Sequence, residues 1–358
     1  MSDKKGLPRV EYEDIISGAG RLNKDIKLKE SEKVGIVFHK GDVLYGKLRP
    51  YLQNWLLATF NGLAVGDFWV LQPQNTDSSF LYRLVQSQRF DGVANQSTGT
   101  KMPRADWKLV SKTKFAMPHS VDEQAAIGAY FEHLDTLITL HQRKYEKLVN
   151  IKKSMLDKMF PKNGASVPEI RFKGFTDLWE QRKLKELYFQ LTERNTDLLP
   201  YQKTLSVATM SFKTDGNGAA DTSLANYKRL RTGDIAFEGH TSKEFRYGRF
   251  VLNDVGDGIM SPRFSALRPL HEMPINFWKY YIHYEPIMRK VLVNSTKAGT
   301  MMNELVINDF LQGSILVPSM TEQQAIGRFF KQLDTLITLH QREHIKPILE
   351  VKRVKRNE

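Results

Sequence analysis

The sequence contains no cysteine, and none of its apolar runs approaches the ~20 residues that a membrane-spanning helix needs. The absence of cysteine excludes disulfides and cysteine-based metal sites, and it fits a cytoplasmic protein. The first residues, Met1-Ser-Asp-Lys-Lys5, are not followed by the apolar core of a secretion signal. We therefore expect a cytoplasmic protein with no membrane partner.

Motifs for catalysis are also scarce. The sequence has no methyltransferase tetrad of the Asn-Pro-Pro-Tyr kind and no Gly-x-Gly cofactor loop after a strand. The stretch Gly41–Lys47 has the spacing of a phosphate-binding loop, but Leu48 stands where a hydroxyl would bind Mg²⁺. The stretch His340–His344 matches an inverted zinc-protease signature, whereas its counterpart in an internal repeat, His141–Tyr145, does not. We expect no catalytic residue, metal or cofactor, although scattered acids and lysines leave a nuclease site open.

The length and charge of the chain indicate two basic domains. Its 358 residues, 41% of them apolar, allow two globular domains of ordinary size. The net charge of +13 divides into +6 on residues 1–121, zero on 122–160, +4 on 161–320 and +3 on 321–358. Most of the excess positive charge therefore lies on the regions before and after a neutral segment. This distribution favours two domains that bind a polyanion. A charge that serves solubility alone is the alternative.

An internal repeat organises the chain. The ten residues from Leu134 to Arg143 return unchanged from Leu333 to Arg342. The likeness extends toward the N-terminus, where Glu-Gln-Ala-Ala-Ile-Gly at 123–128 matches Glu-Gln-Gln-Ala-Ile-Gly at 322–327. Ten consecutive residues that recur unchanged later in the chain indicate a duplicated unit.

The repeated segments are predicted to be long helices that pair with each other. Ser120 with Glu123, and Thr321 with Gln324, have the spacing of a capping box at a helix start. A stripe with alternating spacings of four and three residues predicts a seam for a partner helix, and the second copy is the obvious partner. The predicted seam and subunit-binding residues are Leu134, Ile138, His141, Tyr145 and Leu148 in the first copy, and Leu333, Ile337 and His340 in the second.

The regions before each repeat have the pattern of mixed strands and helices. In the first, Lys33–Lys40, Val43–Tyr45, Trp55–Leu57 and Val65–Leu71 read as strands, Phe80–Gln88 as a helix, and Leu109–Met117 as a last strand. The second region follows the same plan loosely, with a Gly-Asp turn at 233–234 that corresponds to Gly41-Asp42. We predict four parts: residues 1–121 as a first domain, 122–160 as a long helix, 161–320 as a linker and second domain, and 321–358 as a second, shorter helix.

The order of these motifs resembles one known family. A Glu-Gln-x-x-Ile stretch leads into a Leu-Asp-x-Leu-Ile helix, and an Arg-Phe-x-Gly-Phe…Trp-Glu-Gln-Arg-Lys-Leu segment at 171–184 precedes the second domain. This order is similar to that of the specificity subunits of type I restriction–modification systems. The resemblance implies an α/β fold of the α+β kind, in which two target-recognition domains are separated by helices that form an antiparallel coiled coil.

The resemblance also implies a function. Each domain would read one half of a bipartite site on double-stranded DNA, and the helices would dock methylation subunits, two of them expected, which restriction subunits then join. The first domain has no counterpart of the 171–184 segment before it, and the second helix is short. We therefore also consider a shortened variant, a structural partner of the methylation subunit that does not read a full site.

Cations and aromatic residues in loops are the candidates for DNA contacts, because arginine can bind guanine and lysine commonly binds phosphate. A solvated surface charge is the alternative for each of them. In the first domain the candidates are Lys47, Arg49, Tyr51, Lys101 and Arg104; in the second they are Lys243, Arg246, Tyr247, Arg249, Arg263 and Lys297.

Overall fold

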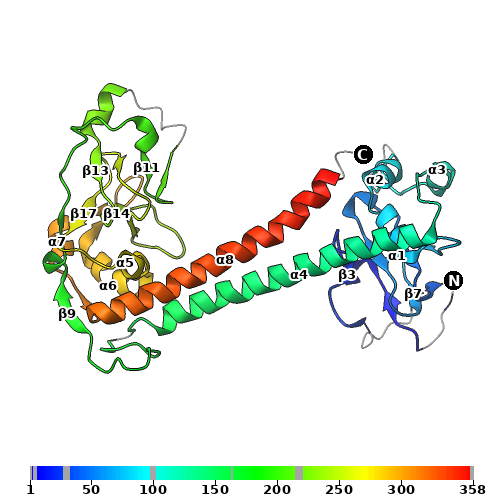
Figure 1. Cartoon of the computed structure of the whole chain (residues 1–358), viewed down its shortest axis with the longest axis horizontal. Coiled ribbons are helices and arrows are strands. Elements are labelled where there is room, and N and C mark those ends of the chain that lie inside the picture. The colour runs from blue at the N-terminus through cyan, green and yellow to red at the C-terminus, as the bar shows by residue number, and fades with distance from the viewer. Residues whose placement is uncertain are drawn as a thin grey trace. The chain divides into compact units, whose positions relative to one another are not determined.

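The computed structural model describes residues 2, 6–26, 33–96, 102–162, 164–213 and 221–354, without the side chains of 221, 222 and 344–354. The chain forms two compact units, which are described separately (Figure 1). Unit 1 comprises residues 1–142 and 342–358, and unit 2 comprises residues 143–341. Both units mix helices and strands, which confirms the predicted α+β class. No helix among the described residues is long and apolar enough to cross a membrane.

Unit 1 contains short strands followed by short helices. Two three-stranded sheets have the orders β1-β7-β4 and β6-β5-β8, and β2 pairs with β3. The central strand β5 is buried along its whole length. The elements are β1 (Arg9–Val10), β2 (Ile15–Ile16), β3 (Arg21–Leu22), β4 (Ile36–Phe38), β5 (Val43–Gly46), β6 (Trp55–Leu57), β7 (Gly62–Ala64), β8 (Phe68–Leu71), α1 (Ser78–Leu84), α2 (Gln88–Ala94), α3 (Trp107–Lys112) and α4 (Val121–Lys158), whose residues from Arg143 onward belong to unit 2.

Unit 2 has a four-stranded sheet in the order β10-β17-β14-β15 and several two-stranded pairs. Its elements are β9 (Glu180–Lys183), β10 (Tyr188–Gln190), β11 (Leu205–Ser206), β12 (Ser211–Phe212), β13 (Lys228–Leu230), β14 (Ile235–Glu238), β15 (Arg249–Leu252), β16 (Gly258–Met260), β17 (Ala266–Pro269), α5 (Ile275–Tyr281), α6 (Glu285–Ser295), β18 (Thr296–Lys297), β19 (Glu304–Leu305), α7 (Ile307–Gln312), β20 (Ser314–Val317) and α8 (Met320–Val354). The last helix returns to unit 1 from Arg342 onward.

The two units repeat one plan. Strand β5 pairs antiparallel with β6 and β8, and β14 pairs antiparallel with β15 and β17. Each central strand begins after a Gly-Asp turn with a left-handed glycine, at φ +96° for Gly41 and +95° for Gly233. The following aspartate closes the turn, because Asp42 accepts from the His39 N–H at 2.8 Å and Asp234 from the Arg231 N–H at 2.7 Å. The same local chemistry therefore sets both central strands.

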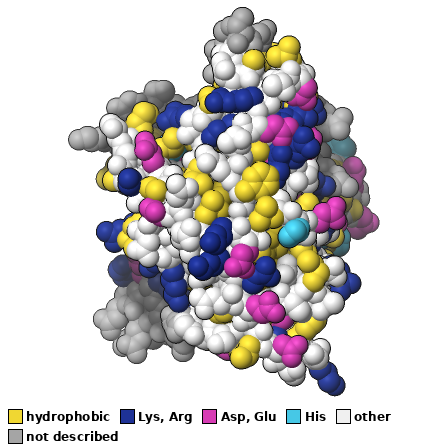
Figure 2. Space-filling model, turned by 90° about the vertical axis from the view of Figure 1, so that its left-hand side faces the viewer, with side chains coloured by type: hydrophobic (Ala, Val, Ile, Leu, Met, Phe, Trp, Pro, Cys, Tyr) yellow, Lys and Arg dark blue, Asp and Glu magenta, His cyan; other side chains and the backbone are white. Residues whose placement is uncertain are grey.

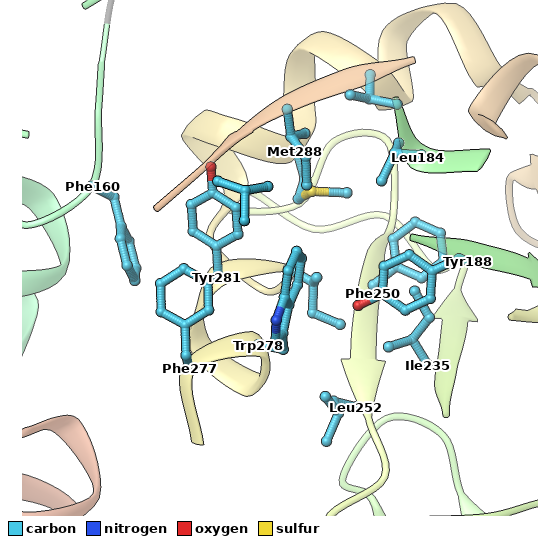
Figure 3. Close-up of a cluster of buried hydrophobic side chains, with 14 of the residues drawn as sticks. Phe160, Leu184, Tyr188, Ile235, Phe250, Leu252, Phe277, Trp278, Tyr281 and Met288 are labelled. Atoms are coloured by element: carbon cyan, nitrogen blue, oxygen red, sulfur yellow. The ribbon is translucent and has the colours of Figure 1, made fainter. Parts of the chain in front are cut away.

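Aromatic side chains fill the core of unit 2. The rings of Phe277 and Tyr281 on α5 are stacked, and their centroids are 5.0 Å apart. Phe160, just after α4, meets Tyr281 edge-on at 5.2 Å (Figure 3). The Trp278 indole lies in the same cluster and donates its N–H to Gln323 Oε1 at 3.0 Å. The start of α8 is thus bound to the core by a polar contact as well as by packing.

A glutamine in each repeat holds the long helix to the short helix of its unit. Gln124 donates from Nε2 to the Pro118 carbonyl at 2.8 Å and accepts from the Asp77 N–H at 3.0 Å. Gln323 donates to the Pro318 carbonyl at 2.9 Å and accepts from the Trp278 indole. Both amides are buried with donor and acceptor satisfied, which is the condition under which a buried amide stabilises a fold.

A glycine in each repeat permits close contact between those helices. A Cβ at Gly128 would lie 1.8 Å from Ser79 Oγ and 3.1 Å from the Phe80 nitrogen, at the start of α1. A Cβ at Gly327 would lie 2.7 Å from the Phe277 nitrogen, at the start of α5. The identical Glu-Gln-x-Ala-Ile-Gly stretches therefore encode the same helix–helix contact twice.

Within unit 2, the end of α4 and the start of α8 run antiparallel. The Phe160 and Phe330 rings lie 5.9 Å apart, and eight residues earlier on α4 the Lys152 ammonium contacts Asp334 Oδ1 at 2.5 Å. Asp334 also accepts from the Tyr280 hydroxyl at 2.5 Å, and burial together with this carboxylate raises the pKa of Tyr280. Lys152 and Asp334 therefore form an ion pair inside the helix contact.

Two sequence predictions about these elements are wrong. The stretch Leu109–Met117 is not a strand, because its first part continues helix α3 and residues 114–118 pair with no described strand. Its counterpart in unit 2, β20, is a strand because β9 pairs with it. A strand forms only where a partner satisfies its backbone, and periodicity cannot show that partner.

The second error concerns a helix cap. Helix α8 begins at Met320, so Thr321 lies within its first turn and cannot be the cap. Ser319 Oγ instead accepts from the Glu322 N–H at 3.4 Å, as Ser120 Oγ does from the Glu123 N–H.

The predicted strands at Val43–Tyr45 and Trp55–Leu57 are confirmed as β5 and β6.

The glycine contact predicts opposite effects of the same substitution at two helical sites. Gly327→Ala should destabilise the protein by about 1–3 kcal/mol, because the new methyl group meets backbone atoms of α5 that cannot move aside freely. Gly92→Ala on α2 should be neutral or stabilise by up to about 1 kcal/mol, because nothing lies within 4 Å of the added carbon. Thermal unfolding followed by circular dichroism checks both variants. Equal midpoints for the two would contradict the close contact.

Candidate functional site

In unit 1, backbone hydrogen bonds bring two of the candidate loops together. The Arg49 N–H donates to the Pro103 carbonyl at 2.7 Å, and the Ala105 N–H donates to the Lys47 carbonyl at 2.8 Å. Leu48 and Arg104 form an antiparallel bridge between them. The sequence offered Lys47–Tyr51 and Lys101–Arg104 as separate candidates, and the structure places the described part of both in one site. Lys101 lies outside the described residues.

Asp67 forms ion pairs with two of the candidate cations in this site. Its carboxylate lies 3.0 Å from the Arg104 guanidinium and 3.7 Å from the Lys47 ammonium. Its carbonyl accepts from the Tyr12 hydroxyl at 2.7 Å, and that hydroxyl accepts from the Leu48 N–H at 2.9 Å. Burial raises the pKa of Tyr12, so the hydroxyl keeps the proton that it donates. Lys47 and Arg104 thus help to hold the loop, and neither carries a fully free charge.

Arg49 and Tyr51 differ from those two cations. Arg49 has a left-handed backbone at φ 50° and ψ 63°, a conformation that costs of order 1–3 kcal/mol in a residue with a side chain. Its Nε is buried and has no hydrogen-bond partner among the described residues. The Tyr51 ring is 56% exposed. Strain and an unsatisfied donor together are typical of a residue that is held for a ligand.

In unit 2, Asn303 fixes the corresponding loop. Its N–H donates to the Gly239 carbonyl at 2.9 Å, and its side chain donates to the Arg246 carbonyl at 3.4 Å. A Cβ at Gly239 would lie only 2.0 Å from the Asn303 carbonyl oxygen, so no larger residue fits at that position. The residue that follows the central strand therefore accepts an equivalent backbone hydrogen bond in both units, Lys47 from Ala105 and Gly239 from Asn303.

Glu238, at the end of β14, organises the base of that loop. Its carboxylate is only 8% exposed, binds the His240 ring and lies 3.7 Å from Arg249 Nε. Arg249 also donates to the Ala208 carbonyl at 3.1 Å, and its guanidinium lies 5.0 Å from the Phe245 ring. Arg249 is therefore a half-buried part of the loop framework, in contrast to the exposed Lys243 and Arg246.

The remaining candidates of unit 2 lie at three further points. The Arg246 guanidinium is 5.9 Å from the half-buried Tyr247 ring. Arg263 is exposed after β16, with its guanidinium 5.7 Å from the Phe264 ring. Lys297 is exposed in β18. Figure 2 shows one face of the molecule on which Lys and Arg side chains are spread among acidic and hydrophobic ones.

Sequence reasoning missed four residues that shape these sites: Tyr12, Asp67, Glu238 and Asn303. Asn303 comes directly after the stretch 294–302, which contains the candidate Lys297, so its position beside a candidate loop was a signal. Tyr12 and Asp67 act through main-chain atoms of residues far along the chain, so no local pattern identifies them.

The predicted seam residues lie on the less exposed side of their helices. Leu134 and Leu333, at the same position of the two repeats, are each 7% exposed, and His340 is buried. Ile138, His141, Tyr145, Leu148 and Ile337 are half-buried. His141 Nε2 lies 3.4 Å from Glu343 Oε2. By contrast, Leu140 and Leu339, which also share a repeat position, are 55% and 46% exposed.

Two curated proteins are similar to the chain in sequence. The specificity subunit of the type I restriction enzyme EcoDI from Escherichia coli is 26% identical over 127 residues, which cover 34% of this chain and 28% of that protein. The specificity subunit of the type I restriction enzyme MjaVIII from Methanocaldococcus jannaschii is 24% identical over 290 residues, which cover 75% of this chain and 65% of that protein. The chain thus spans less than two thirds of the length of either relative.

A solved structure shares the fold. The S subunit of a type I restriction–modification system from M. genitalium aligns with a TM-score of 0.58 at 13% identity, covering 99% of this chain and 89% of that one. No protein-family model matches the chain. The resemblance to type I specificity subunits that the motifs predicted is confirmed by these similarities.

The hydrogen bonds of Tyr12 predict a contrast between two tyrosines of unit 1. Tyr12→Phe should cost about 1–3 kcal/mol, because it leaves the half-buried Leu48 N–H and the Asp67 carbonyl without their partner. Tyr51→Phe should change stability by less than about 0.5 kcal/mol, because its ring is exposed. Urea unfolding measures both. A neutral Tyr12→Phe would show that the loop is held by its backbone contacts alone.

Proposed function

We propose that this chain is the DNA-recognition subunit of a type I restriction–modification complex, and that each unit reads one half of a bipartite DNA site. The observation that carries the proposal is the repeated site. In both units the carbonyl of the residue after the central strand accepts a backbone hydrogen bond from a later loop, at Lys47 from Ala105 and at Gly239 from Asn303. The side chains on those loops differ between the units. A common frame with different side chains suits two readers of different sequences.

The two sites have the chemistry of double-stranded DNA recognition. Arg49 in unit 1 and Arg246 in unit 2 stand on fixed loops and provide planar donors that match the guanine edge. Exposed Lys243, Arg263 and Lys297 would bind phosphates and set the register. Lys47, Arg104 and Arg249 would act mainly by holding the loops. The first two form ion pairs with Asp67, and Arg249 donates a hydrogen bond to the Ala208 carbonyl. Similarity to specificity subunits over 75% of the chain supports this assignment.

The chain would contribute recognition and assembly, and its partners would contribute the chemistry. Methylation subunits would modify the bound site and restriction subunits would cleave DNA. The repeated Leu140 and Leu339 support two docking sites for methylation subunits. Each is an exposed leucine at the same place in an identical ten-residue sequence, outside the half-buried seam. Their exposure at the same position of both copies is the basis for placing a partner contact there.

The two-reader proposal predicts separate effects of two arginine substitutions on the methylation motif. Arg49→Ala should relax reading of one half-site, and Arg246→Ala should relax reading of the other. The expected loss is about 1–3 kcal/mol of discrimination at one base pair, roughly tenfold to a hundredfold. Sequencing of methylated adenines in cells that carry the chain and a methylation subunit measures this. Arg289→Ala, a surface arginine on α6, is the matched control.

The outcomes discriminate clearly. If both substitutions blur the same half-site, the assignment of one reader to each unit is wrong. If no motif changes although methylation persists, Arg49 and Arg246 do not read bases.

The assembly proposal predicts stepwise loss of partners. Leu140→Glu and Leu339→Glu should each remove one methylation subunit from the complex, and the double variant should remove both, because a charge cannot enter an apolar contact cheaply. Native mass spectrometry of the copurified complex counts the subunits. Val149→Glu is the control, because Val149 is also exposed on α4 but lies outside the repeat. An unchanged count in the double variant would exclude these leucines as docking residues.

A further inference from the structure

In unit 2, a short hairpin lies beside the loop that carries Arg246. Strand β18 pairs antiparallel with β19, and Lys297 lies opposite Glu304. Leu305, at the end of β19, is buried in the large hydrophobic cluster, which fixes the base of the hairpin to the core. The hairpin therefore presents its tip, residues 298–303, from a fixed base.

The tip itself is held in one arrangement. A Cβ at Gly299 would lie 2.3 Å from the Met302 carbonyl oxygen, so the turn closes tightly on itself. The Asn303 N–H donates to the Gly239 carbonyl at 2.9 Å, and the Asn303 side chain donates to the Arg246 carbonyl at 3.4 Å. Within unit 2, the tip and the Arg246 loop therefore lie side by side.

The tip exposes an apolar side chain. Met301 is 75% exposed, and no large apolar side chain among the described residues is more exposed. A methionine held in water on a fixed backbone gives up the favourable burial of its side chain, and a ligand that covers it supplies that burial. Met301 is thus positioned for a contact that forms only when a ligand is bound.

Unit 1 has a methionine at a related point. The sequence Gly-Thr-Lys-Met at 99–102 corresponds to Gly-Thr-Met-Met at 299–302. Met102 is 53% exposed and precedes Pro103, whose carbonyl accepts the Arg49 N–H at 2.7 Å. A single exposed apolar residue needs no explanation. An exposed methionine beside the proposed reading arginine of each unit does, because it recurs where the function is placed.

The charges around Met301 favour DNA as the ligand. Lys297 and Arg246 are exposed cations, and the tip itself carries no acidic residue. A DNA phosphate can therefore approach from either side of the tip, which would bring Met301 toward the bases.

We propose that Met301 makes an apolar contact with a DNA base in the half-site that unit 2 reads, and that Met102 does so in the other half-site. The inference rests on the proposed function and adds a second mode of reading to it. Arginine donates hydrogen bonds to a base edge. The methionine packs on an apolar base surface, which is either the C5-methyl group of thymine or the face of a base at an opened step. Its unbranched, polarisable side chain fits both surfaces.

The test uses the complex of the full chain with a methylation subunit, and a fluorescent duplex that carries the methylation motif found in cells. Fluorescence anisotropy measures the affinity. Met301→Ala should weaken binding about tenfold, because one apolar contact with a base is lost. Met301→Leu should bind within about threefold of the parent, because it keeps the apolar volume.

Salt dependence separates this role from phosphate binding. Met301→Ala should leave the slope of log affinity against log salt concentration unchanged, because no phosphate contact is lost. Lys297→Ala should reduce the magnitude of that slope by about 1. Val293→Ala is the matched control, because Val293 on α6 is also an exposed apolar residue of unit 2, and it should bind as the parent does.

Modified duplexes identify the base surface, with each thymine and each adenine of the half-site replaced in turn. Uracil in place of the contacted thymine lacks the C5-methyl group, so it should weaken binding by the parent and not weaken binding by Met301→Ala further. 2-Aminopurine brightens when a neighbouring base unstacks, and at an opened step Met301→Ala should abolish that increase. Met102→Ala should give the same pattern with replacements in the other half-site.

Two results would overturn the inference and leave the proposed function intact. One is a Met301→Ala complex that binds the motif as tightly as the parent does. The other is a loss of affinity that depends on no thymine methyl group and changes no 2-aminopurine signal, because Met301 then contacts no base. A parent complex that does not prefer the motif over a scrambled duplex would instead overturn the proposed function, and this inference with it.

Discussion

The fold depends on the close contact between each long helix and the short helix of its unit. Gly128 and Gly327 permit this contact, and at both positions a methyl group would overlap atoms of the neighbouring helix. Gln124 and Gln323 then fix the angle and register of the long helix, because each amide is bound on both its donor and its acceptor side. Packing alone would permit sliding, whereas a buried amide with two fixed partners permits one arrangement.

Backbone turns and main-chain hydrogen bonds determine the shape of the candidate sites. The Gly-Asp turns determine where the central strands begin, and the candidate loops follow directly after those strands. The loops are then held by hydrogen bonds between backbone atoms, as between Arg49 and Pro103 or Asn303 and Gly239. Side chains on such loops can change without loss of the frame. Two domains with one architecture can therefore recognise different ligands, which is the arrangement that a bipartite site requires.

Charge and position separate the cations of these loops into two kinds. Arg104 and Lys47 share Asp67, and Arg249 is bound to a carbonyl and lies near Glu238. Substitution of these three residues would therefore act mainly on the structure of the loops and less on a direct contact with a ligand. Among the described residues, the guanidinium groups of Arg49 and Arg246 form no hydrogen bond or ion pair, and that of Arg246 lies 5.9 Å from the Tyr247 ring. We infer that both remain available to a ligand. A sequence shows both kinds as basic residues in a polar loop, and only the three-dimensional contacts separate them.

The sequence by itself determined the duplication, the α+β class, the two long helices and the loops in which the cations stand. These follow from local patterns: an identical ten-residue repeat, apolar spacing, and a glycine where a turn needs a positive φ. The tertiary structure decided which segments find a partner. Residues 114–118 and β20 have similar sequences, yet only β20 is a strand, because β9 satisfies its backbone. The same dependence on distant partners gave Tyr12 and Asp67 their roles, since hydrogen bonds to residues far along the chain leave no periodic trace in a sequence.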